Sequence, residues 1–192
     1  LADARLASLH AQGEPQFLLA MLGRVERLYE RDPAAADRVL DALIAFLREA
    51  TPLLRREASS LGEECRLLEA WLRMLDDQEL ATVPAVELDA GTVRLPMPPG
   101  LLVSLAQQIV GDALAAGLQL TVRSRRRADG TDGGLHATGC GIGAAAAGLG
   151  DALAAAAQRL ELAHGPGSSI RARADGPDRL TLDIALNDHR GD

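Results

Sequence analysis

Apolar positions recur every three or four residues through the first part of the chain. Between residues 2 and 29 they predict one amphipathic helix. Asp32 and Pro33 then mark a break and a restart, because aspartate caps helices and proline suits the first helical turn. A second apolar seam predicts one long helix over residues 34–77, with a kink at Pro52. The two helices together form a hairpin.

A hairpin of two amphipathic helices buries only part of its apolar surface. A second copy of the chain would complete a four-helix bundle, so we predict a homodimer. The alternative is that the same seam packs against the α/β part of its own chain.

The remainder of the chain changes from a helical period to short segments of strand and helix character. Their order predicts an α+β sandwich, with one mixed sheet and helices on one face. We therefore divide the chain into a helical hairpin over residues 1–79 and an α/β domain over residues 80–192. The elements expected in the second part are a β-hairpin over 83–95, a helix over 100–116, a strand over 118–123, a turn over 130–134, a helix over 144–163 and a terminal hairpin formed by 168–174 and 179–186.

The composition of the chain argues against several classes of function. The 192 residues carry a formal net charge of −7, which argues against nucleic acid as a partner. Cys65 and Cys140 are widely spaced and fit neither a zinc motif nor a disulfide framework. No stretch is long and apolar enough to cross a bilayer, so we expect any membrane attachment to lie outside this chain.

The stretch over residues 9–22 resembles the phosphoacceptor region of LytS-type sensor histidine kinases, whose pattern is roughly L-x-A-Q-x-x-P-H-F-L-x-N-x-L. Gln16 occupies the position of the phosphorylated histidine, and Ala20 that of the usual asparagine. We therefore expect no catalytic residue here. The matching residues are Leu9, Ala11, Gln12, Pro15, Phe17, Leu18 and Leu22.

The second predicted helix continues this resemblance. Phe46-Leu47-Arg48 matches part of an L-x-x-L-L-R-Y element, and Leu61-Gly62-Glu63-Glu64 begins an L-x-E-E-L element. Taken by themselves, Glu63 and Glu64 fit a solvated helix face. The resemblance implies the cytoplasmic portion of a bacterial inner-membrane protein, which forms a homodimer and binds a response regulator or a partner kinase.

The second half resembles the Bergerat-type (GHKL) ATP-binding domain of histidine kinases and gyrases. Such domains use ATP and magnesium, but we expect no cofactor here, because the motif positions are altered. Asp112 stands where the family has its metal-binding asparagine; it is the one candidate left for Mg²⁺, and we expect no metal site. Gly139 replaces the adenine-reading aspartate, in a motif continued by Gly141 and Gly143. The phosphate-facing turn is represented by Gly150, while Ala152 replaces its second glycine.

Arg123, Arg125 and Arg127 alternate along a predicted strand, so they share one face. They could bind an anion, such as a phosphate or a cyclic dinucleotide. The alternative is a solvated edge strand that is protected by its charge. His136 and Cys140 are four residues apart, but two ligands do not make a metal site.

These losses favour a pseudokinase that acts in two-component signalling as a dimeric scaffold or regulator, without autophosphorylation. One alternative is an atypical active histidine kinase, or a response-regulator phosphatase in which the Gln16 amide orients water. A third possibility is a sensor module that binds an anion or a nucleotide.

Overall fold

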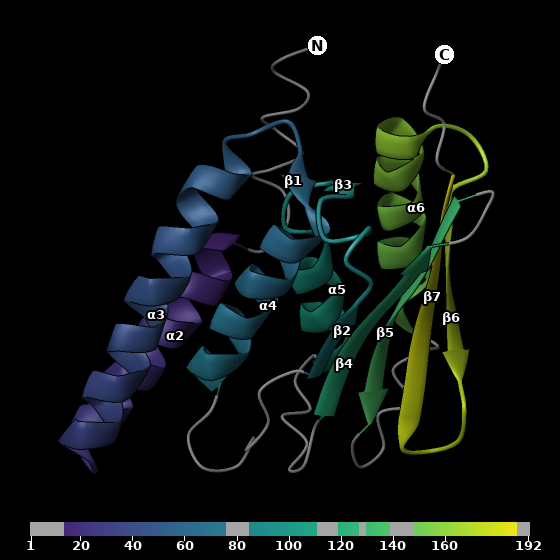
Figure 1. Ribbon diagram of the computed structural model, residues 1–192. Helices are drawn as coiled ribbons and strands as arrows, with labels where there is room; N and C mark the ends of the chain where they lie inside the picture. The colour runs from purple at the N-terminus through teal and green to yellow at the C-terminus, as the bar shows by residue number, and fades with distance from the viewer. Residues whose placement is uncertain (1–13, 76–84, 111–118, 127–129, 139–147, 188–192) are drawn as a thin grey trace.

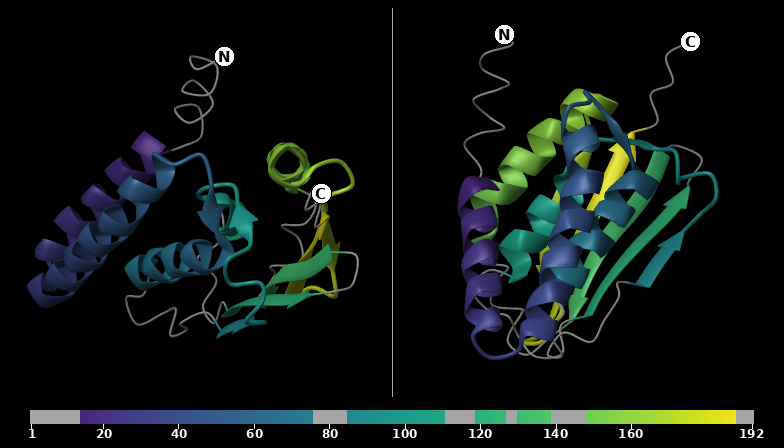
Figure 2. Two further views of the ribbon diagram at one scale, coloured as in Figure 1. Left: turned by 45° about the horizontal axis from the view of Figure 1, so that its top comes forward. Right: turned by 90° about the vertical axis from the view of Figure 1, so that its left-hand side faces the viewer.

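The computed structural model describes residues 14–75, 85–110, 119–126, 130–138 and 148–187. A mixed five-stranded sheet is covered on one face by helices, and a helical hairpin lies beyond them (Figure 1 and Figure 2). The α+β architecture with one mixed sheet, predicted from the order of the elements, is confirmed.

The hairpin consists of helices α2 (Glu14–Tyr29) and α3 (Pro33–Leu54). The restart between them is confirmed: Asp32 is the N-cap of α3, and its Oδ1 accepts a hydrogen bond from the backbone N–H of Ala35 at 3.0 Å. This contact satisfies one of the N–H groups that the first turn of a helix leaves without an intrahelical partner.

The prediction of one continuous second helix is wrong. Helix α3 ends at Leu54, two residues after Pro52, and a short strand, β1 (Ser59–Ser60), precedes helix α4 (Leu61–Leu75). Proline has no backbone N–H and clashes with the preceding turn, which weakens the last turn of α3.

A capping box then starts the new helix. The carboxylate of Glu63 accepts from the backbone N–H of Ser60 at 2.8 Å, and the Ser60 Oγ accepts from the backbone N–H of Glu63 at 3.3 Å. This reciprocal pair fixes the start of α4. The S-x-x-E spacing is visible in the sequence and could have predicted the break.

The sheet has the order β2-β4-β5-β7-β6. Strand β2 pairs in parallel with β4, and the other neighbours are antiparallel. The predicted terminal hairpin is confirmed as β6 and β7, and the predicted strand over 118–123 is confirmed as part of β4. The bounds are Ala85–Leu88 for β2, Gln119–Arg126 for β4, Gly130–Thr138 for β5, Ser169–Ala174 for β6 and Arg179–Asn187 for β7.

Two local predictions are wrong. The segment 83–95 does not form a hairpin, because β2 pairs with β4, and strand β3 (Pro96–Met97) pairs with β1. The glycine-rich segment 130–134 is not a turn but the beginning of β5, where pairing to strands on both sides overrides the low strand propensity of glycine.

Helices α5 (Leu101–Val110) and α6 (Gly150–His164) lie on the same side of the sheet as α4 (Figure 2). Alternate residues of the central strands point toward these helices and are almost completely buried. This apolar layer is the main core and includes Leu120, Val122, Leu135, Ala137, Leu180 and Leu182.

The apolar seam of the hairpin is buried within a single chain, where α3 packs against α4 and α4 packs against α5. Its buried members include Met21, Val25, Val39, Leu43 and Phe46. Other apolar side chains of the hairpin remain exposed, namely Leu19, Leu22, Ile44 and Leu47. The four-helix bundle and the homodimer remain predictions. Among the described helices, none is long and apolar enough to cross a membrane.

Candidate functional site

Gln16, the residue at the phosphoacceptor position, lies in the first turns of α2. Most of the other predicted cleft residues fall outside the described residues: Asp112, Gly139, Gly141 and Gly143. Their roles therefore remain predictions from the sequence.

Gly150 and Ala152 lie at the start of α6, where Gly150 is exposed and Ala152 is half-buried. The N-terminus of a helix favours anions, because its free N–H groups carry partial positive charge. Asp151 lies in this first turn and opposes that preference. Because of Asp151, the residues at the start of α6 form a poor binding site for phosphate.

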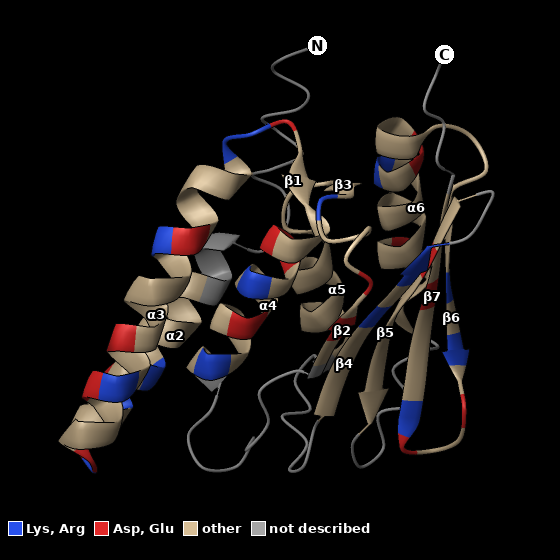
Figure 3. Cartoon of the chain, in the orientation of Figure 1, with Lys and Arg blue, Asp and Glu red and all other residues tan. Residues whose placement is uncertain are grey.

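Arg123 and Arg125 lie on one exposed face of β4, as predicted, whereas Arg127 is outside the described residues. Arg123 donates from Nε to the Glu87 carboxylate at 2.9 Å, and Arg125 is opposite Asp132 in the register. Figure 3 shows acidic positions among the basic positions of the sheet. The described arginines therefore face acidic neighbours and do not form a purely basic patch.

The alternative interpretation of this strand also needs correction. Strand β4 is not an edge strand, because it lies between β2 and β5. Its charges consequently lie on an open face of the sheet and do not protect an edge.

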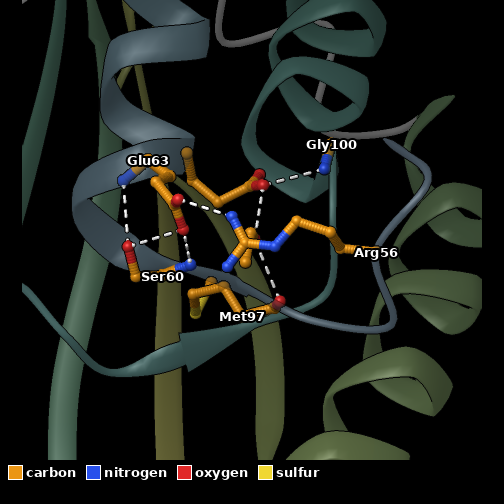
Figure 4. Close-up of polar contacts among 7 residues, drawn as sticks. Arg56, Ser60, Glu63, Met97 and Gly100 are labelled. Carbon is orange, nitrogen blue, oxygen red and sulfur yellow. Dashed lines mark hydrogen bonds and ion pairs between the residues drawn. The ribbon is translucent and has the colours of Figure 1, made fainter. Parts of the chain in front are cut away.

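The most constrained polar site was not predicted. It surrounds residues 96–102, which we call the 96–102 turn. This segment comprises β3, the connection that follows it and the first two residues of α5. Glu64 of α4 is completely buried beside this turn. Its Oε1 accepts from the backbone N–H of Gly100 at 2.8 Å (Figure 4). Its Oε2 accepts from the backbone N–H of Leu102 at 3.1 Å. The interpretation of Glu64 as part of a solvated helix face is wrong.

Ser59 extends this contact to the other side of the turn. Its Oγ lies 2.7 Å from the Glu64 Oε1 and 3.0 Å from the carbonyl oxygen of Met97. A hydroxyl has one proton, which these two acceptors share while Glu64 is ionised. When Glu64 is protonated it can donate to Ser59, which then donates to Met97.

Helix α6 holds the same turn from the opposite direction. Arg159 donates from Nη2 to the carbonyl oxygen of Pro99, and the Nε2 of His164 lies 2.6 Å from the carbonyl oxygen of Pro96. Side chains of α6, α4 and β1 thus bind successive backbone groups of the 96–102 turn. Such contacts give hydrogen-bond partners to backbone N–H and C=O groups that lie outside the regular helices and strands.

Burial dominates the electrostatics of this site. It raises the pKa of Glu64, while Ser59, the two backbone donors and Arg159 oppose that change. Burial also lowers the pKa of Arg159, and the Glu64 charge acts against this change. By contrast, the pKa of Glu63 is lowered chiefly by its hydrogen bond to Arg56, at 2.7 Å.

The side chains of this site hold separate elements of the fold together. The site links the start of α4 to α5, which ends just before Asp112, and to α6, which begins at Gly150. The segment 55–60 joins α3 to the start of α4, beside the 96–102 turn.

Cys65 and possible metal ligands are further candidates for a reactive centre. Burial raises the pKa of the Cys65 thiol to about 12, which leaves it protonated and unreactive at neutral pH. Within the described ranges, no three histidine, cysteine or acidic side chains are grouped in a way that could hold a metal ion.

Comparison with known proteins agrees with this fold. The family model described as Histidine kinase matches residues 4–76, which is less than half of the chain. A bacterial phosphotransferase structure is similar over 96% of this chain and 97% of its own, at 17% identity and a TM-score of 0.51.

Histidine kinase structures are also similar. The Acinetobacter baumannii histidine kinase AdeS matches over 88% of this chain and 95% of its own, with 16% identity and a TM-score of 0.45. The histidine kinase ThkA, solved in complex with the response regulator protein TrrA, matches over 99% of this chain and 62% of its own, with 14% identity and a TM-score of 0.46. A search of curated proteins gave no match.

Residues 4–76 thus match the histidine kinase family model, and the chain as a whole has a fold similar to that of a bacterial phosphotransferase.

Proposed function

We propose that this chain is a pseudokinase of two-component signalling, which acts as a dimeric scaffold or regulator. One observation carries the proposal: the family match covers the stretch that should hold the phosphoacceptor histidine, and Gln16 stands there. A glutamine amide does not form the phosphoramidate that a histidine nitrogen forms. The altered motif positions at Asp112, Gly139 and Ala152 support the same conclusion.

The 96–102 turn provides a physical route for such a role. A scaffold must transmit the geometry of its hairpin to the surface that its partner contacts. Because Glu64 and Arg159 hold the same turn, a displacement of α4 is transferred to α5 and α6 through hydrogen bonds that are buried or half-buried. The partner is a response regulator or a partner kinase, and any membrane attachment lies outside this chain.

The homodimer belongs to this proposal. The exposed apolar residues Leu19 and Leu22 of α2, with Ile44 and Leu47 of α3, recur at helical spacing on the hairpin. A second copy of the hairpin would remove these side chains from water.

Calorimetry with magnesium and ATP tests the loss of kinase chemistry. We expect no heat of binding beyond dilution, and micromolar binding would overturn the proposal. Titration with a response regulator in the same buffer tests the scaffold role, for which we expect saturable binding.

A phosphatase function is the second candidate, because the Gln16 amide could orient a water molecule toward a phosphorylated regulator. Incubation with a phosphorylated regulator distinguishes the two. The scaffold leaves the rate of hydrolysis unchanged, whereas a phosphatase accelerates hydrolysis and loses this effect in Gln16→Ala.

A further inference from the structure

The face of the sheet that points away from the helices carries a histidine that the preceding roles do not use. His136 of β5 lies opposite Thr121 of β4 and opposite Thr181 of β7 in the register. Its side chain is half-buried, whereas Thr181 is almost completely buried beneath the surrounding polar groups.

A chain of hydrogen bonds fixes the imidazole. The Oγ1 of Thr181 donates to the Asp175 carboxylate at 3.0 Å, and it lies 3.2 Å from the Nδ1 of His136. Because the hydroxyl proton is used for Asp175, the hydroxyl oxygen accepts from Nδ1–H. This assignment places the proton of the neutral imidazole on Nδ1 and leaves the lone pair on Nε2.

Nε2 lies over a glycine. A Cβ added to Gly134 would come within 3.1 Å of this nitrogen, so the imidazole lies close over the Gly134 backbone and a larger residue at 134 would press on Nε2. In the register, Gly134 lies between Arg123 on one side and Asp183 on the other. Among the described residues, none makes a hydrogen bond to Nε2.

The charged neighbours are consistent with a neutral, available nitrogen. Burial lowers the pKa of His136, and Arg123 and Arg173 act in the same direction, whereas Asp183 and Asp175 oppose them. Arg173 also pairs with both of these carboxylates, at 3.4 Å to Asp175 and 3.8 Å to Asp183. Arg173, which lies on β6, thus partly neutralises the charge of Asp183 from the far side of β7.

We propose that His136 is a nucleophile that accepts a phosphoryl group on Nε2 from an acyl phosphate. The Nε2 lone pair forms a bond to phosphorus, the bond between phosphorus and the acyl oxygen breaks, and a carboxylate leaves. Nδ1 keeps its proton, and Thr181 with Asp175 stabilises the positive charge on the ring. Arg123, which also pairs with Glu87, lies opposite Gly134, the residue beside Nε2, and is the nearest cation for the phosphoryl oxygens in the register.

This modification is independent of the proposed function, because it uses neither Gln16 nor ATP. An acyl phosphate is the chemical class to which acetyl phosphate and a phosphorylated aspartate belong. The first of these is the probe for the test.

The intact chain is incubated with acetyl phosphate and analysed by intact mass, followed by peptide mapping at alkaline pH, where phosphohistidine survives. We expect the mass of one added phosphoryl group, located on His136 and absent from His136→Gln. His164→Gln is the matched control, because the Nε2 of His164 is engaged by the carbonyl oxygen of Pro96. This control variant keeps the adduct.

A second variant tests the hydrogen-bond chain. Thr181→Val slows adduct formation roughly fivefold, as expected for the loss of one hydrogen bond. The wild-type rate also persists below pH 6.5, the ordinary pKa of histidine, because the folded imidazole stays neutral at lower pH.

The proposal is overturned if acetyl phosphate leaves the wild-type mass unchanged, or if His136→Gln keeps the adduct. Loss of the adduct in His10→Gln, with retention in His136→Gln, would assign it to a different residue. Circular dichroism of each variant confirms that the comparison is made between folded proteins.

Discussion

The 96–102 turn and the α2–α3 hairpin both connect to the start of α4, but different forces hold them. Around the turn, the buried side chains of Ser59 and Glu64 and the half-buried Arg159 of α6 bind the backbone of one short segment. In the hairpin, apolar side chains pack on one face, while Leu19 and Leu22 remain in water on another. Directional bonds make the turn rigid, whereas apolar packing lets the hairpin accept a partner.

Two neighbouring carboxylates show the same difference on a smaller scale. Glu64 is completely buried and is bound by backbone donors, so burial raises its pKa. Glu63 has a side chain that is 25% exposed and pairs with Arg56, so its pKa is lowered. Adjacent residues of one type therefore respond to pH in opposite directions.

The largest effect is expected for Glu64→Ala. The variant leaves the buried N–H groups of Gly100 and Leu102 without acceptors and removes the countercharge of Arg159, which costs about 3 kcal/mol of unfolding free energy. Urea denaturation measures this loss. Glu63→Ala is the matched control, for which we expect a loss of about 1 kcal/mol of unfolding free energy. Equal losses in the two variants would contradict the distinction between the buried Glu64 and the solvated Glu63.

A smaller effect is expected in the pH dependence of stability. Because the folded pKa of Glu64 is raised, its contribution is fully present below pH 4.5, the ordinary glutamate value, and is lost as pH rises through the folded pKa. Glu64→Gln removes this dependence, so its unfolding free energy falls less than that of the wild type on going from pH 4.5 to pH 7. Thermal denaturation across this range measures the difference. Identical pH profiles for the two proteins would exclude titration of Glu64.

The exposed ion pair should contribute less. Arg56→Gln removes the bond to Glu63 and lowers stability by about 0.5 kcal/mol at neutral pH, because the Arg56 side chain is 54% exposed and its charge is screened by water. The loss disappears as pH falls through the lowered pKa of Glu63, since a protonated carboxyl no longer pairs with the guanidinium. Denaturation at two pH values measures both effects. A loss of unfolding free energy as large as that of Glu64→Ala would show that Arg56 supports the 96–102 turn as strongly as the buried Glu64 does.

The smallest effect on stability is expected in the exposed face of the hairpin. The double variant Leu22→Glu, Ile44→Glu changes the unfolding free energy of the monomer by about 0.5 kcal/mol or less, because both side chains are already in water. It abolishes the proposed dimer, which light scattering after size exclusion detects as a halved mass. Arg38→Glu on the exposed surface of α3 is a control that leaves the mass unchanged. A wild-type protein that is monomeric at high concentration would contradict the homodimer.

The sequence by itself determined the features that depend on neighbouring residues. The cap at Asp32, the alternation of β4 and the terminal hairpin each follow from a local preference that the structure retains. The order of strands and helices predicted the α+β architecture, and the acceptor-like stretch around Gln16 predicted the similarity to histidine kinases.

Only the tertiary structure decided which distant groups meet. Glu64 and Gly100 are far apart in the sequence, and nothing in the helical pattern of α4 distinguishes a buried carboxylate from a solvated one. The chain from Asp175 through Thr181 to His136 depends likewise on the register of β5 against β7. Hydrogen bonds between distant segments form only after the sheet and helices have packed, so their partners cannot be derived from local preference.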